Sequence, residues 1–249
     1  MRKSIFETAW HRTIERRICD VLNAEKGYLS ASTARSTRAV GDAIQDILAD
    51  RFQSLVGDDV CKNYSKDFAR RAMADLAFED CDGFYYVVDV KTHRLRSAFN
   101  MPNLTSVDRL ARFYESDGNF FVVLLVAYDL KDLDVVAEKV HFIPIEFLEW
   151  DCLTVGALGW GQIQIANSNR ILIDPSGSRK NWMLRMCDIL IDEFYPRELG
   201  KIDKRIDRFR RVQAVLGAAR ISVSESGPLA MRRRNGQSTR IYVGSQQHG

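Results

Sequence analysis

FYYVVDVKT, residues 84–92, is the stretch from which the fold of this chain can be inferred. Its aromatic and β-branched residues predict a strand. Because side chains alternate between the two faces of a strand, Asp89 and Lys91 should point to one face and Val90 to the other. An acid and an ammonium group on an otherwise apolar strand are costly to bury unless they pair or bind something. The segment therefore predicts both a central strand and a candidate site.

A second strand-like run, residues 73–78, precedes it, and the turn-forming residues 79–83 lie between the two. If the hairpin closes with Asp80 facing Phe84, then Asp75 faces Asp89, and their Cβ atoms lie roughly 5 Å apart. Two facing carboxylates repel each other unless a cation lies between them, and oxygen ligands suit Mg²⁺. A slip of one residue would turn Asp75 to the other face and remove this site.

The predicted cluster suits phosphoryl chemistry. A carboxylate pair could hold Mg²⁺, which would polarise a phosphoryl oxygen and activate a water molecule. Lys91 could orient that water and stabilise the negative charge that develops. In the alternative interpretation, Asp89 and Lys91 merely pair at a strand end, while Asp75 is solvated.

The remaining patterns predict an α/β domain over residues 1–220, with a basic and flexible tail over residues 221–249. Gly83 can take a positive φ and therefore favours a turn. The hydroxyl of Thr105 or Ser106 could cap a helix that begins there. Pro196 should interrupt the long C-terminal helical region. The predicted helices are 4–27, 39–56, 105–114, 179–195 and 197–216, and the other predicted strands are 119–128, 139–145 and 161–165.

Charge is distributed unevenly along the 249 residues, although the formal net charge is only +3. Residues 201–249 contain 11 Lys/Arg and 3 Asp/Glu, and residues 1–40 contain 8 and 4. Basic ends around an acidic centre suit a protein whose ends bind a polyanion while central carboxylates bind a cation. Solvated helix faces and a loose tail would produce the same counts.

The cysteines, the apolar runs and the N-terminal residues indicate the cellular compartment of the protein. The five cysteines are scattered without a CxxC pair, which favours free thiols over disulfides or a zinc site. The longest apolar run, residues 120–128, is far shorter than the roughly 20 residues of a membrane helix. Charged residues interrupt the N-terminal apolar positions, which is unlike a signal peptide. We therefore expect a cytoplasmic protein with no membrane partner.

The arrangement of Asp75 and Asp89-Val90-Lys91 resembles the PD-(D/E)xK signature of type II restriction endonucleases, with Ala74 in place of the proline. Residues 89–128, DVKTHRLRSAFNMPNLTSVDRLARFYESDGNFFVVLLVAY, are similar to the corresponding region of the HpaI- and HincII-like group. ALGWGQIQI, residues 157–165, is similar to the small-residue segment of that group that ends in QIQ. The resemblance covers about residues 39–215.

This resemblance implies a restriction-endonuclease-like fold, with a central mixed β-sheet flanked by helices. It implies that Asp75, Asp89 and the Val90 carbonyl bind Mg²⁺ and that Lys91 is catalytic. A supporting acid would come from Asp42 or Asp46, and the choice stays open. Trp160 could equally pack in a core. The residues that the resemblance places on DNA are Asn100, Asn103, Ala157, Gly159, Trp160, Gly161 and Gln162.

The function that this resemblance implies is Mg²⁺-dependent hydrolysis of double-stranded DNA at a short palindromic sequence of about six base pairs, cut near its centre to leave blunt ends. A palindromic target predicts a homodimer, and a DNA methyltransferase would be the genetic partner. Two alternatives remain: a structure-specific or repair nuclease of the same fold, and a catalytically inactive DNA-binding protein.

Overall fold

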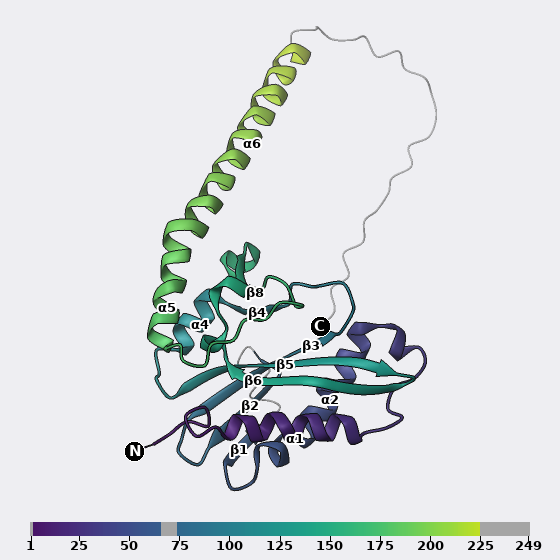
Figure 1. Cartoon of the computed structure of the whole chain (residues 1–249). Coiled ribbons are helices and arrows are strands. Elements are labelled where there is room, and N and C mark those ends of the chain that lie inside the picture. The colour runs from purple at the N-terminus through teal and green to yellow at the C-terminus, as the bar shows by residue number, and fades with distance from the viewer. Residues whose placement is uncertain (1, 66–73, 225–249) are drawn as a thin grey trace, which may run out of the picture. The chain divides into compact units, whose positions relative to one another are not determined.

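The computed structural model (Figure 1) describes residues 2–65 and 74–224. They belong to two units, Met1–Pro196 and Arg197–Gly249. The strands are β1 (Cys61–Ser65), β2 (Leu76–Asp80), β3 (Tyr85–Arg94), β4 (Asn103–Ser106), β5 (Asn119–Lys131), β6 (Asp134–Pro144), β7 (Leu153–Gly156) and β8 (Gln162–Ile165). The helices are α1 (Trp10–Ala24), α2 (Thr37–Val56), α4 (Val107–Phe113), α5 (Arg179–Asp188) and α6 (Tyr195–Ser224), with a π-helical segment, η5 (Ile189–Phe194).

Five strands of the first unit form a mixed sheet in the order β1-β2-β3-β5-β6. Only β3 and β5 run parallel, and the other neighbours are antiparallel. The expectation of an α/β fold with a central mixed sheet is therefore confirmed. A smaller antiparallel sheet has the order β4-β8-β7. Figure 1 shows α1 below the larger sheet and β4, β8 and α4 above it.

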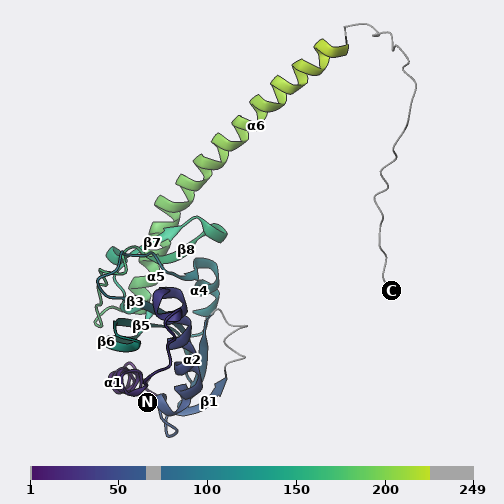
Figure 2. The same cartoon turned by 90° about the vertical axis from the view of Figure 1, so that its right-hand side faces the viewer.

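Two apolar clusters, one on each face of the larger sheet, hold these layers together. Val88, Val122 and Leu124 pack with residues of α1 and α2 in one cluster. Val87, Phe121 and Val123 pack with residues of α4, α5, β7 and β8 in the other. Both faces of β5 are thus covered, as its continuous apolar run predicts. Figure 2, where α1 is seen end-on, shows the same layers from the side.

The hairpin between β2 and β3 is fastened by a buried acid, Asp80. Its side chain accepts hydrogen bonds from the Phe84 N–H (2.9 Å) and from the Tyr86 hydroxyl (2.7 Å). The Asp80 N–H also donates to the Phe84 carbonyl (3.0 Å), the pairing that the turn chemistry predicts. Gly83 has the expected positive φ of 78°. These local bonds fix the register of the strand that carries the candidate site.

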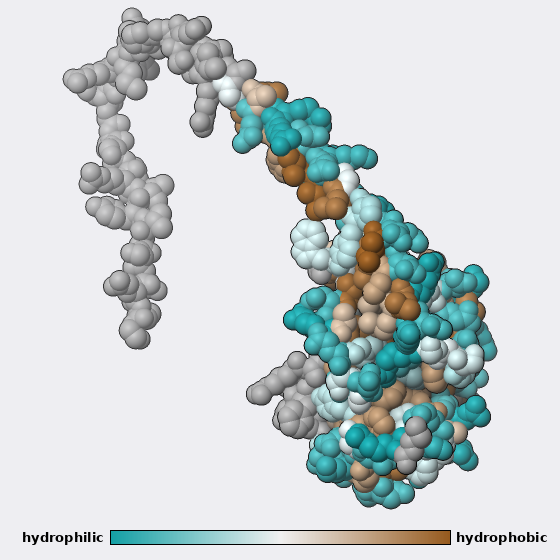
Figure 3. Space-filling model, turned by 90° about the vertical axis from the view of Figure 1, so that its left-hand side faces the viewer, coloured by the Kyte–Doolittle hydropathy of each residue, from teal (hydrophilic) through white to brown (hydrophobic). Residues whose placement is uncertain are grey.

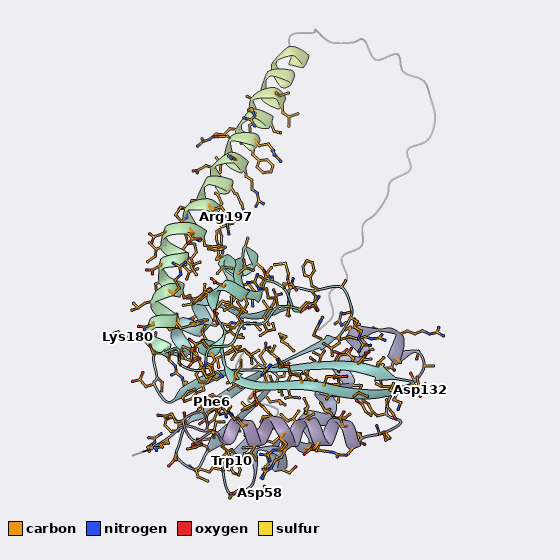
Figure 4. All side chains as sticks on the ribbon, viewed as in Figure 1. Phe6, Trp10, Asp58, Asp132, Lys180 and Arg197 are labelled. Atoms are coloured by element: carbon orange, nitrogen blue, oxygen red, sulfur yellow. The ribbon has the colours of Figure 1, made fainter. Side chains whose placement is uncertain are left out.

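The N-terminal helix begins later than predicted. Ala9 has a φ of 57°, so helical geometry starts only at Trp10. The preceding residues instead form turns that place Phe6 against the rings of Tyr86, Phe120 and Phe142, at centroid distances of 6.0, 5.5 and 6.1 Å. Figure 4 labels Phe6 where this segment meets the sheet. Aromatic burial therefore outweighs continuation of the helix.

Pro196 does not interrupt the C-terminal helical region as the sequence predicted. Tyr195, with φ −65° and ψ −40°, connects η5 to α6 in helical geometry. A proline inside an α-helix lacks an N–H and collides with the carbonyl four residues earlier. The wider π-turn just before Pro196 relieves that conflict without ending the helix. α6 also continues beyond residue 216 to Ser224, and residues 225–249 of the predicted tail lie outside the described part.

Other expectations can be checked directly. Ser106 caps α4, because its hydroxyl accepts a hydrogen bond from the Arg109 N–H (3.2 Å). All five cysteines are free. No helix within the described residues is both long and apolar enough to cross a membrane.

Candidate active site

The predicted register of the β2–β3 hairpin is confirmed. Leu76 pairs with Val88 and Ala77 pairs with Val87, as they must if Asp75 is to lie on the same face as Asp89. The alternation along β3 is also confirmed, because Val90 belongs to the α1–α2 cluster, whereas Val87, on the same face as Asp89, belongs to the other. Met73, the predicted first residue of the strand, lies outside the described residues.

Asp75 lies at the point where β2 leaves β3. Its N–H donates to the Val88 carbonyl (3.0 Å), and its Oδ2 accepts a hydrogen bond from the Val90 N–H (2.7 Å). The carboxylate thereby takes the place that a backbone carbonyl would occupy if β2 continued. The N–H and C=O of one strand residue point to the same side, so the Val90 carbonyl is directed toward the side on which Asp75 lies.

Asp89 is almost completely buried, with 5% of its surface exposed. Its Oδ1 accepts a hydrogen bond from the Lys91 Nζ at 2.7 Å, and the two groups form an ion pair. Its Oδ2 has no hydrogen-bond partner among the described residues. Burial raises the pKa of the Asp89 carboxyl to about 7, Lys91 opposes that rise, and the nearby Asp75 carboxylate adds to it.

These features fit a divalent cation. Among the described residues, the buried Asp89 carboxylate has one oxygen without a hydrogen-bond partner, and the Asp75 carboxylate nearby raises its pKa. A cation between the two carboxylates would stabilise both of them. No cluster of three or more His, Cys, Asp or Glu side chains occurs in the described part of the chain. The groups that could hold such a cation are Asp75, Asp89 and the Val90 carbonyl, and so small a set would suit Mg²⁺, which binds few carboxylates and keeps several waters.

Neither candidate for the supporting acid joins this cluster. Asp42 and Asp46 lie on the exposed side of α2, and neither is among the groups that shift the pKa of Asp89. Gly41 of α2 lies close to β3, and an added Cβ there would lie 2.7 Å from the Thr92 Oγ1. At this point α2 meets β3 through a small residue rather than an acid.

A pocket of about 230 Å³ opens beside Lys91. The wall of the pocket that is formed by the sheet carries basic side chains on neighbouring strands. The pKa of His141 is lowered mainly by burial and also by the positive charge of Lys139. The imidazole of His93 is within hydrogen-bonding distance of the Asn169 Oδ1 (2.6 Å), which joins the sheet to the opposite wall. The polar and basic lining residues are Lys91, Thr92, His93, Lys139 and His141 on the sheet and Asn100, Ser168 and Asn169 opposite.

Asn100 and Asn103 lie on the chain segment that leaves this pocket. Asn100 is exposed, and its backbone exchanges hydrogen bonds with Ser168: the Asn100 N–H donates to the Ser168 Oγ (3.0 Å), and the Ser168 N–H to the Asn100 carbonyl (3.1 Å). Asn103 begins β4, and its Oδ1 accepts a hydrogen bond from the Gln164 Nε2 (2.5 Å). The structure thereby joins the two segments that the resemblance placed on DNA.

Gln164 was missed as a candidate by the sequence reasoning. Ile163 and Ile165 of β8 are buried, so Gln162 and Gln164 lie on the opposite face of the small sheet, together with Asn103 and Thr154. A Cβ at Gly156 would lie 2.6 Å from the Gln164 Oε1, so the glycine lets this amide occupy its present position. The alternation in QIQI was the available signal, because it puts both glutamines on one face.

The loop of residues 157–161 connects β7 to β8, and Ala157, Leu158 and Trp160 are exposed in it, whereas Gly161 is buried. Leu158 and Trp160 are 67% and 68% exposed, so the interpretation of Trp160 as a core residue is wrong. Trp160 has a φ of 66°, which is uncommon for a residue with a side chain. Gly161, with φ 140°, follows it. Ala157 and Gly159 belong to the same loop, and Gln162 is the first residue of β8.

Comparisons with protein-family models and with curated proteins found no match to this chain.

Proposed function

We propose that this protein is a Mg²⁺-dependent endonuclease of the PD-(D/E)xK type with a restriction-endonuclease-like fold, which hydrolyses double-stranded DNA at a short specific sequence. The observation that carries this proposal is the buried Asp89 carboxylate, which pairs with Lys91 through one oxygen and has no hydrogen-bond partner among the described residues for the other. A buried acid with a raised pKa costs stability, and such costs are concentrated at functional sites.

In this proposal, Asp75, Asp89 and the Val90 carbonyl hold the metal ion. When bound, Mg²⁺ would supply the positive charge that makes a phosphodiester more electrophilic and a water more acidic. Lys91 stabilises the negative charge that develops on the phosphate, and its ion pair with Asp89 holds the ammonium group in place (2.7 Å). Water exclusion around Asp89 strengthens both interactions.

Sequence recognition would use the polar face of the small sheet and the adjacent loop. Asn and Gln side chains can form paired hydrogen bonds with the major-groove edge of adenine. Exposed Trp160 would contact the DNA surface by stacking or apolar packing. A palindrome of about six base pairs, cut near its centre to leave blunt ends, would be read by a homodimer with one site per strand. A DNA methyltransferase would protect the same sequence in the cell.

The direct test is a digest of plasmid or phage DNA with purified protein and Mg²⁺. We expect discrete fragments, and sequencing their ends would identify the target and the cut position. Ca²⁺ in place of Mg²⁺ should support binding without cleavage. Cleavage restricted to mismatched or branched DNA would favour a structure-specific nuclease, and salt-sensitive binding with no cleavage would favour an inactive DNA-binding protein.

Asn103→Ala and Gln164→Ala should each weaken binding to the specific sequence about tenfold to a hundredfold and leave binding to random DNA nearly unchanged. The two side chains are hydrogen-bonded to each other, so the double variant should lose less than the sum of the single losses. Titrations with the specific and a scrambled duplex at one salt concentration measure both quantities. Equal losses on the two duplexes would mean that these residues do not read bases.

A further inference from the structure

Helix α6 carries an exposed apolar stripe along the second unit. Leu199, Ile206, Phe209 and Leu216 are 60%, 43%, 67% and 61% exposed. Together with the partly exposed Ile202, they recur at alternating spacings of three and four residues, and Gln213 fills the remaining position of the pattern. Figure 3 shows apolar surface between hydrophilic stretches along this helix. This spacing is typical of the contact seam of a two-stranded coiled coil.

Charged residues flank this seam and restrict how a second helix could pair with it. Glu198 and Arg205 border one side, and Asp203 and Arg210 border the other. In a parallel pair, the flanking residue on one side faces the flanking residue five positions further along the partner. Glu198 would then meet Asp203, and Arg205 would meet Arg210. Every charged contact of a parallel pair would therefore be repulsive.

An antiparallel pair instead brings flanking residues of the same side together. When Ile206 packs on Phe209 of the second copy, Asp203 of each helix lies beside Arg210 of the other, and no like charges meet. Leu199 then packs on Leu216. Sliding the helices by one heptad in either direction would bring Asp203 onto Asp203 or Arg210 onto Arg210. One register is therefore favoured by both the apolar and the charged positions.

We propose that α6 is a self-association helix that binds a second copy of this chain in an antiparallel pair over residues 199–216, with Ile206 packed on Phe209 and Asp203 paired with Arg210. Gln213 faces Ile202 in this register, and a polar side chain in the seam weakens an association while specifying its register. The seam is short, so we expect a reversible dimer whose population depends on concentration. The seam belongs to the second unit, whereas the residues of the candidate active site belong to the first.

The test is sedimentation of the full chain, without DNA or Mg²⁺, across micromolar concentrations. We expect a monomer–dimer equilibrium. Ile206→Asp should abolish dimerisation because it removes two central apolar contacts, and Gln213→Leu should strengthen it at least about tenfold. Asp203→Arg and Arg210→Asp should each weaken it about tenfold, and the double charge swap should restore it. Both charged positions are solvent-exposed on α6, so these variants leave the folding of the chain intact.

Several results would overturn the proposal. A chain that is monomeric at every concentration has no such association. A dimer that is unaffected by Ile206→Asp is formed by another surface. A parallel pair would be indicated if Asp203→Arg and Arg210→Asp each strengthened dimerisation, since each would turn a repulsive contact into an attractive one. Because this test measures association of the chain and not DNA cleavage, its failure can be distinguished from a failure of the proposed nuclease activity, and Lys91→Ala should sediment like the wild-type chain.

Discussion

Lys91→Ala should lower the rate of Mg²⁺-dependent DNA cleavage about a hundred- to a thousandfold and change DNA affinity by less than about threefold. The Lys91 Nζ lies 2.7 Å from the Asp89 Oδ1, and its side chain is only 22% exposed. An ammonium group held in a partly dehydrated site stabilises developing charge far more than one in bulk water. Single-turnover cleavage at saturating enzyme measures the chemical step, and a binding titration in Ca²⁺ measures affinity.

Lys139→Ala is the matched control for this experiment. Lys139 lines the same pocket from β6 but is exposed, and it is not the lysine that pairs with Asp89. Its removal takes the same charge from the pocket without disturbing the carboxylates, so the single-turnover rate should change by less than about tenfold. If the two alanine variants slowed cleavage equally, Lys91 would be one member of a basic surface and the proposed role would be wrong.

Asp89→Asn should stabilise the folded protein at neutral and alkaline pH while abolishing cleavage. Burial raises the pKa of the Asp89 carboxyl from 3.8 to about 7, so between these values the folded state binds a proton that the unfolded state has released. Stability from this group therefore falls as pH rises from about 4 to about 7 and stays low above that range. Asparagine carries no charge to bury, so Asp89→Asn should raise the free energy of unfolding by on the order of 2–4 kcal/mol near pH 8 and by less near pH 5.

Urea unfolding of the wild-type protein and the variant at the two pH values, without divalent metal, would measure this gain. Asp80→Asn is the matched control, because Asp80 is another buried acid on the same hairpin but both of its oxygens accept hydrogen bonds. That variant should lose about 1 kcal/mol of stability at either pH. If Asp89→Asn were less stable than the wild-type protein near pH 8, the buried Asp89 carboxylate would not be destabilising the folded state, and the prediction would be wrong.

Much of the candidate site could be predicted because it depends on local rules. The turn at residues 79–83 sets the register, and the period of two then puts Asp75, Asp89 and Lys91 on one face. The buried strand at β5 and the cap at Ser106 follow from equally short patterns. The choice between Asp42 and Asp46 was beyond such rules, since the side of α2 that meets β3 depends on a distant contact at Thr92.

The sequence by itself therefore determined the hairpin register, the alternation along β3 and the α/β class, because each follows from interactions between residues close in the chain. Only the tertiary structure decided that the Asp75 carboxylate accepts a hydrogen bond from the Val90 N–H, that one oxygen of Asp89 has no partner in the described part of the chain, and that Asn103 meets Gln164. These features depend on where β2 leaves β3 and on how the small sheet packs. Such packing balances burial against hydrogen bonding across segments far apart in sequence, and no short pattern encodes that balance.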